Sequence, residues 1–208
     1  PDADNFDNQA AYDDGSCEYT QIVEISRSRL NMLSFNIDLE DSMVDDVFAN
    51  TSELLFISND DGEFYIPEYN LNTINDLDIK GYYGALNTES NTNAYVQVSG
   101  KRVDLSSEIT LRHHSSNLIP YLPVNQYHVE DVFGYLYDEI LFIANDQGEY
   151  WIPSLGVSNL TFMSPGSAYV VFLETEIDQD IIFTYDGIGS TLSRVNDIRY
   201  FDSMLMVS

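Results

Sequence analysis

The chain has 208 residues, with 35 Asp and Glu against 8 Lys and Arg, and its formal net charge is −27. Such a charge repels polyanions, which excludes nucleic acid and anionic lipid as partners. The hydrophobic fraction of 44% excludes a disordered acidic chain. No apolar run approaches the roughly 20 residues that span a bilayer, so we expect no membrane insertion.

An acidic element without a basic residue occupies residues 1–19. Closely spaced carboxylates can supply the roughly six to eight oxygen ligands that Ca²⁺ takes. The candidate ligands are Asp2, Asp4, Asp7, Asp13 and Asp14. Their spacing does not match an EF-hand loop, because no Glu closes it. A solvated acidic linker is the alternative, and calcium is the one cofactor that these residues suggest.

An internal repeat organises most of the remaining chain. Residues 54–67 return as residues 140–153, and matching stretches keep nearly the same register from residue 22 to residue 187. The further matched stretches are 31–35 with 117–121, 44–48 with 129–133, 82–86 with 169–173 and 95–100 with 182–187. We therefore predict two tandem homologous repeats, 20–105 and 106–189.

The pattern within each repeat is mainly β. Residues 42–45 resemble a capping box that opens one or two helical turns. Residues 54–67 are two strands joined at Asn59-Asp60-Asp61-Gly62, a sequence typical of a hairpin turn. Apolar residues on both faces of the first hairpin strand predict that it is covered on both sides. The predicted fold class is mainly β with short helices (α+β), in two tandem β-rich repeats.

The C-terminal segment, residues 190–208, combines bases with an apolar run. Arg194 and Arg199 are two of the chain's eight bases. The apolar run consists of Met204, Leu205, Met206 and Val207. A basic, apolar patch attracts an acidic neighbour, which can be another copy of the chain. We therefore predict self-association or docking to a protein partner through this segment. The alternative is that the segment completes the second repeat's own sheet.

Aromatic residues suggest a second kind of binding site. Tyr65, Tyr69, Tyr150 and Trp151 could stack on sugar rings and form a glycan platform. Core packing is the alternative, because large aromatic residues on hairpins are usually partly buried. Glycan is therefore the second partner class that the sequence suggests.

No catalytic motif is present in the sequence. His113 and His114 are adjacent, and on an extended segment they point to opposite faces, so they would not bind one ion together. A serine nucleophile elbow, a zinc-protease helix motif and a phosphate-binding loop are all missing. We therefore expect no catalytic residue and no enzyme.

The repeats resemble a tandem module of secreted and surface proteins. The resemblance rests on residues 31–35, 44–48, 64–67, 72–74 and 81–83. The module's pattern runs Gly-Trp-Asn-Leu-Ile-Ser, then a helix, an aromatic-rich hairpin, a Pro and a Gly-Lys-Gly-Tyr strand. Leu30 and Ser116 stand where the module has Trp, and Ser167-Ala168-Tyr169 replaces the second Gly-Tyr.

Residues 1–19 resemble a short Asp-Gly-Ser-Cys element of marine bacterial surface proteins and of some marine phage or algal-virus structural proteins. That element has a cysteine just before its Pro, which implies that the disulfide partner of Cys17 precedes Pro1. The resemblances carry over no enzymatic residue and imply a surface location.

From these patterns we expect a non-catalytic structural or adhesive module of an extracellular, cell-surface or virion protein, acting in assembly or attachment. The alternative is a carbohydrate-binding, lectin-like module or an accessory domain of a larger secreted enzyme.

Overall fold

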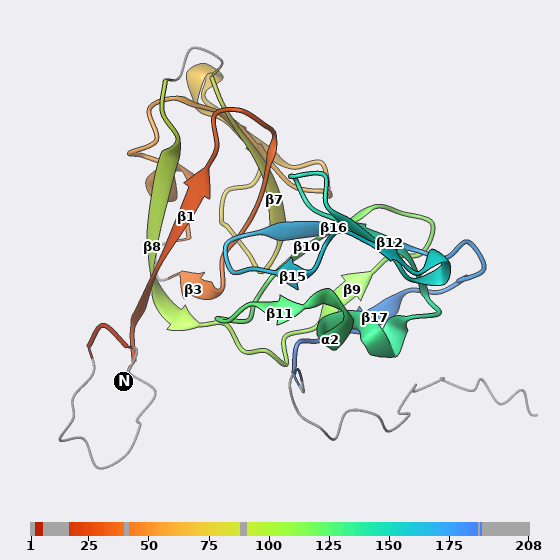
Figure 1. The fold of residues 1–208 in the computed structure, drawn as a ribbon. Coiled ribbons are helices and arrows are strands. Elements are labelled where there is room, and N and C mark those ends of the chain that lie inside the picture. The colour runs from red at the N-terminus through yellow and green to blue at the C-terminus, as the bar shows by residue number, and fades with distance from the viewer. Residues whose placement is uncertain (1–2, 6–16, 40–41, 88–90, 187, 189–208) are drawn as a thin grey trace, which may run out of the picture.

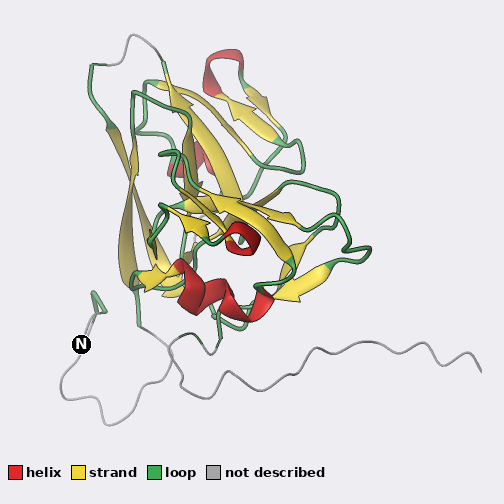
Figure 2. Cartoon of the chain, turned by 45° about the vertical axis from the view of Figure 1, so that its right-hand side comes forward, coloured by secondary structure: helices red, strands yellow, loops and turns green. Residues whose placement is uncertain are grey.

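The computed structural model describes residues 3–5, 17–39, 42–87, 91–186 and 188. Strands account for 43% and helices for 11%, which confirms the predicted mainly β class. Figure 2 shows the helices as short segments between strands. Within the described part of the chain, no helix is long and apolar enough to cross a membrane.

Two five-stranded antiparallel sheets form the body of the fold. Sheet I has the order β2 (Asn31–Ser34), β7 (Gly81–Leu86), β4 (Leu54–Ser58), β5 (Phe64–Ile66) and β6 (Leu71–Asn72). Sheet II has the order β10 (Asn117–Pro120), β16 (Ala168–Leu173), β12 (Ile140–Ala144), β13 (Tyr150–Ile152) and β14 (Val157–Ser158). In both sheets a hairpin supplies the third and fourth strands, and a late strand inserts between the first strand and this hairpin.

Smaller sheets and short helices complete the fold. One sheet has the order β1 (Tyr19–Ile25), β8 (Ala94–Arg102) and β3 (Ile37–Leu39). Two strand pairs are β9 (Ile109–Leu111) with β17 (Ile181–Phe183), and β11 (Tyr127–His128) with β15 (Phe162–Met163). The helices are α1 (Val44–Val47), α2 (Val129–Phe133), η1 (Pro67–Tyr69), η2 (Gly134–Leu136) and η3 (Pro153–Leu155).

The turns of the two hairpins, β4–β5 and β12–β13, are closed by the same hydrogen bonds. Asn59 Oδ1 accepts from the backbone N–H groups of Asp61 and Glu63, each at 3.1 Å, and Asn59 Nδ2 donates to Glu63 Oε2 at 2.7 Å. The second turn has the same three bonds among Asn145, Gln147 and Glu149. An Asx side chain that satisfies the turn backbone favours the tight chain reversal that the sequence predicts.

The predicted capping box at residues 42–45 is wrong. Helix α1 begins after Met43, and no side chain caps its N-terminus. Ser42 Oγ donates instead to Asp76 Oδ1 at 3.0 Å, and Ser42 O accepts from the N–H of Leu77 at 2.7 Å. Ser42 therefore fastens the start of α1 to the loop before β7, because these distant partners satisfy its polar groups.

Only one face of the first hairpin strands is buried, which corrects the prediction of two-sided cover. In β4, Leu54 and Ile57 are buried, whereas Leu55 is 38% exposed. A bulge directly after Leu54 shifts the pairing with β7, and β12 has a bulge directly after Ile140 in its pairing with β16. A bulge interrupts the alternation of side chains along a strand, and the apolar outward side chains of both hairpins stay at the surface.

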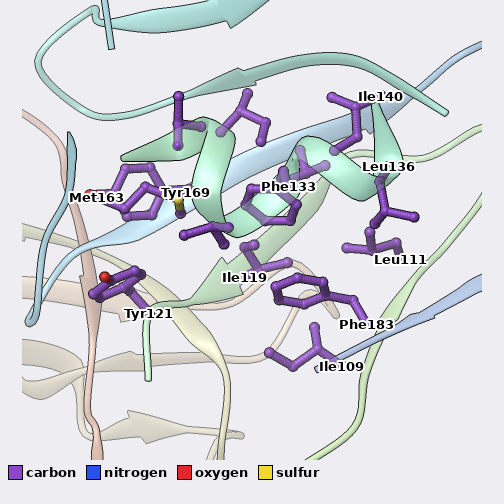
Figure 3. Packing of buried hydrophobic residues seen from close by; sticks show 14 of the residues in the cluster. Ile109, Leu111, Ile119, Tyr121, Phe133, Leu136, Ile140, Met163, Tyr169 and Phe183 are labelled. Carbon is purple, nitrogen blue, oxygen red and sulfur yellow. The ribbon is translucent and has the colours of Figure 1, made fainter. Parts of the chain in front are cut away.

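Each five-stranded sheet packs its inner face on a hydrophobic core. The first core joins sheet I to α1 and to strands β1, β3 and β8. The second joins sheet II to α2 and to the β9–β17 pair (Figure 3). In this second core the rings of Phe133 and Phe183 stack at 4.7 Å between centroids, and Tyr121 packs edge-on against Tyr169 and Tyr185. Ring pairs of this kind stabilise a core beyond the effect of the apolar area that they bury.

Two buried tyrosines hold the loops before β7 and β16. The Tyr82 hydroxyl accepts from the N–H of Asp78 at 2.7 Å, and the Tyr169 hydroxyl accepts from the N–H of Ser164 at 2.8 Å. Burial raises the pKa of both tyrosines from 10.0 to about 12. The folded protein therefore keeps both phenols protonated at a pH where the unfolded chain ionises them.

This difference predicts a loss of stability at high pH. Because the folded pKa is raised, the stabilisation is complete below about pH 10 and is lost as the pH rises towards 12, by about 2.7 kcal/mol per tyrosine. Urea unfolding across this pH range measures the loss. Tyr82→Phe removes one ionising group and should flatten the pH dependence. A variant as pH-sensitive as the wild type would contradict the assignment.

Candidate functional site

Sheets I and II pack against each other through β2 and β7 on one side and β10 and β16 on the other (Figure 1). The contact contains a buried apolar cluster formed by Leu118, Ala168 and Val170 with Met32, Tyr83 and Phe172. At its edge Ser34 N–H donates to Gly166 O at 3.1 Å, and Ser34 Oγ donates to Ser167 O at 2.7 Å. The two halves of the chain therefore share an apolar and hydrogen-bonded interface.

The two sheets approach each other closely at Gly81. A Cβ at this position would lie 2.7 Å from both the Cγ and the carbonyl oxygen of Leu118, and 3.0 Å from the Cβ of Ala168. The backbones can come this close because Gly81 has no side chain.

The second residues of the two hairpin turns make matching contacts across the interface. Asp60 Oδ2 accepts from Arg112 Nη2 at 2.6 Å and from the N–H of Leu118 at 3.0 Å. In the other turn, Asp146 Oδ2 accepts from Arg29 Nε at 2.9 Å and from the N–H of Met32 at 3.3 Å. Each turn therefore binds the edge strand of the opposite sheet and the arginine before it.

A charged network extends this contact on the Asp60 side. Lys80 Nζ lies 2.9 Å from Asp61 Oδ2 and 3.5 Å from Glu63 Oε2, and Arg112 Nη1 lies 2.8 Å from Asp61 Oδ1. The hydrogen bond from Lys80 holds the pKa of Asp61 below its usual value. Asp61, Lys80 and Arg112 line a cavity of about 210 Å³, together with Asp60 and with Leu118 of the opposite sheet. The lining comes from both sheets, so this cavity belongs to the interface, and Lys80 and Arg112 within it are both paired with carboxylates.

The outward surface of the second hairpin is an apolar groove of about 490 Å³. We call face II the six apolar side chains that line it: Phe142, Ala144, Tyr150, Ile152, Leu155 and Val157. Leu155 is 71% exposed and Val157 is 42% exposed. Among the described residues that line the groove, Glu149 is the charged one. Exposed apolar area of this kind marks a contact surface.

The first hairpin has apolar residues at the same places. We call face I the outward side chains Phe56, Phe64, Ile66, Tyr69 and Leu71. Tyr69 is 66% exposed and Leu71 is 47% exposed. They occupy η1 and β6, as Leu155 and Val157 occupy η3 and β14. Faces I and II together are the candidate functional site.

The four aromatic residues suggested as a sugar platform do not lie on one surface. Trp151 is only 2% exposed in the second core, and Tyr65 packs against the first core. Tyr150 and Tyr69 point outward on faces II and I. Alternation along β13 places Tyr150 and Trp151 on opposite faces of the strand, and core packing explains Trp151 and Tyr65.

The two adjacent histidines lie in a turn after β9, which corrects the extended segment assumed from the sequence. The His113 and His114 rings meet edge-on with 5.1 Å between centroids, so they do not point to opposite faces. His113 Nδ1 is 2.7 Å from Asp180 Oδ1, and this hydrogen bond holds the pKa of Asp180 below its usual value. The hydrogen bond between His113 and Asp180 therefore connects this turn to the loop before β17.

Of the candidate calcium ligands, Asp4 lies in the described part of the chain, and its N–H donates to Glu18 O at 2.8 Å. The described residues hold no group of three or more His, Cys, Asp or Glu side chains placed to bind a metal ion. The other candidates lie outside the described residues: Asp2, Asp7, Asp13, Asp14, Arg194, Arg199, Met204, Leu205, Met206 and Val207. The calcium and assembly assignments for these residues stay predictions.

No protein-family model, no curated protein and no solved structure matches this chain. The resemblance to a tandem surface module therefore stays a prediction.

Proposed function

We propose that the chain is a non-catalytic structural or adhesive module of an extracellular, cell-surface or virion protein, and that it acts in assembly or attachment through its outward apolar faces. The observation that carries this proposal is the exposure of Tyr69 and Leu71 on face I, with Leu155 and Val157 at the same places on face II. Apolar groups gathered on the surface of a chain with a net charge of −27 are suited to protein contact.

We also propose that the chain is built from two homologous repeats. The order of strands in sheets I and II supports this, as do the bulges after Leu54 and Ile140. The reciprocal contacts of Asp60 and Asp146 support it further, because related units that pack about a two-fold axis make each contact twice.

The net charge of the molecule is compatible with protein contact at high ionic strength. At an ionic strength near that of body fluids or above, exposed charges are screened over about 8 Å or less. Repulsion between copies is then short-ranged, whereas the burial of Tyr69 or Leu71 against a partner keeps its full effect. We therefore expect association to strengthen with salt.

The chemistry of the groove favours protein contact over the lectin-like alternative. A sugar site needs several polar groups to fix the hydroxyls. Among the described residues that line the groove, apolar side chains predominate and Glu149 supplies the charge. A glycan array with the intact chain separates the two classes, since dose-dependent signal on defined glycans supports the lectin-like class.

The direct test is sedimentation velocity over a concentration series at high salt. We expect larger species in the wild-type chain and their loss in the double variant Tyr69→Ser, Leu71→Ser. Each lost apolar contact of roughly 1.4 kcal/mol should weaken the association at least about tenfold. Ile22→Ser is the control, because Ile22 is 62% exposed on β1, outside both faces. A chain that stays monomeric at every concentration but binds glycans would overturn the proposal.

A further inference from the structure

The groove on face II is only part of a larger apolar surface. Its lining includes Phe142, whose ring stacks on Phe172 at 4.8 Å between centroids. Phe172 in turn packs against the buried cluster between sheets I and II. The outer surface of sheet II is thus covered by sheet I over β10 and β16, and it continues uncovered over β12, β13 and β14.

Face II is also less acidic than face I. Gln147 stands in the second turn where Asp61 stands in the first, and Ser154 stands in η3 where Glu68 stands in η1. The groove of face II therefore has fewer carboxylates around it than face I has. Its occupant has to be apolar, and it must not carry the strong negative charge of the rest of the chain.

One segment of the chain has this chemistry. Residues 189–208 contain two arginines and two aspartates, so their charge balances and residues 1–188 carry the whole net charge of −27. The segment is rich in apolar side chains and contains the run Met204, Leu205, Met206 and Val207. A second copy of the body would instead bring its full negative charge to the groove.

We propose that the apolar run of residues 204–207 docks in the groove of face II of its own chain. The segment follows Ile188, which packs against the second core. Sixteen extended residues span up to roughly 55 Å, whereas a domain of this size has a radius of gyration of about 16 Å. The tether also gives the segment an effective concentration on the order of millimolar at its own groove.

Docking in this way goes beyond the proposed function, because it assigns face II to the chain's own segment and leaves face I as the open surface for a partner. The two proposals can fail separately. The contact is intramolecular, and its absence would leave the sedimentation behaviour of face I variants unchanged.

Hydrogen exchange tests the docking on the full chain and on a chain that ends at Ile188. We expect the amides of residues 150–158 to exchange about tenfold more slowly in the full chain, because docking covers them. The matching residues 64–72 of face I should exchange equally in both chains. Equal exchange of residues 150–158 in the two chains would overturn the proposal.

Matched variants of the full chain provide a second test of the docking. Leu155→Glu with Val157→Glu should speed the exchange of residues 204–207 about tenfold, and Tyr69→Glu with Leu71→Glu should leave it unchanged. All four side chains are exposed, so these variants are expected to fold. Protection of residues 150–158 that grows with protein concentration would also overturn the proposal, because it would assign the occupant to a second copy.

Discussion

Gly81→Ala is expected to destabilise the protein by about 3 kcal/mol, a large effect for the addition of one methyl group. The new Cβ would lie 2.7 Å from the carbonyl oxygen of Leu118 and 3.0 Å from the Cβ of Ala168. A backbone oxygen on the opposite sheet cannot move aside without opening the interface between sheets I and II. Urea unfolding monitored by circular dichroism measures the loss.

Gly134→Ala is the matched control for this substitution. Gly134 has φ of −60°, and a Cβ there would meet nothing within 4 Å. Alanine fits this conformation and restricts the unfolded chain, so the change should be neutral or stabilising by up to about 1 kcal/mol. If both alanine variants unfold at the same urea concentration as the wild type, the sheets do not approach each other as described.

Asn31→Ala should cost at least about 3 kcal/mol. Asn31 is 1% exposed, and its Oδ1 accepts from the N–H of Ser26 at 2.7 Å. Its Nδ2 donates to the carbonyl oxygens of Ser26, Arg29 and Gly84. Removing one side chain therefore leaves several buried backbone groups without partners, and each such group costs about 1–3 kcal/mol.

Asn117→Ala should have a similar effect, because this residue holds the start of β10 as Asn31 holds the start of β2. It is 2% exposed, and its partners are the N–H of Arg112 and the carbonyl oxygens of Arg112, Ser115 and Val171. Asn125→Ala at an exposed position is the control and should change stability by less than about 0.5 kcal/mol. Unequal losses for Asn31 and Asn117 would argue against equivalent roles.

Local sequence patterns were enough to predict the hairpins and the mainly β class. The Asn59 and Asn145 turns carry their own hydrogen-bond partners within five residues, so the chain reversal depends on few distant contacts. The capping box failed for the opposite reason, because Asp76 lies far along the chain and competes for Ser42.

The interface between the sheets could not be predicted in the same way. Asp60 and Asp146 have the sequence context of turn residues, and nothing local shows that each accepts hydrogen bonds from the opposite sheet. A signal did exist: the second turn keeps this Asp while Asp61 changes to Gln147. Small residues at Gly81 and Ala168 were a further signal of close packing.

Faces I and II escaped prediction because apolar residues on both sides of a strand also indicate a buried strand. The bulges after Leu54 and Ile140 and the position of the partner sheet decide which side is covered. Both depend on contacts between distant parts of the chain. Exposure of Tyr69 and Leu155 therefore emerges only from the assembled fold.

The interface around Gly81, Asp60 and Asp146 holds the two cores as one body, so faces I and II are presented in a fixed arrangement. Differential scanning calorimetry of the intact chain tests this most directly. We expect a single transition whose calorimetric and van't Hoff enthalpies agree, because neither core unfolds without the other. Two separate transitions, or a calorimetric enthalpy well above the van't Hoff value, would contradict it.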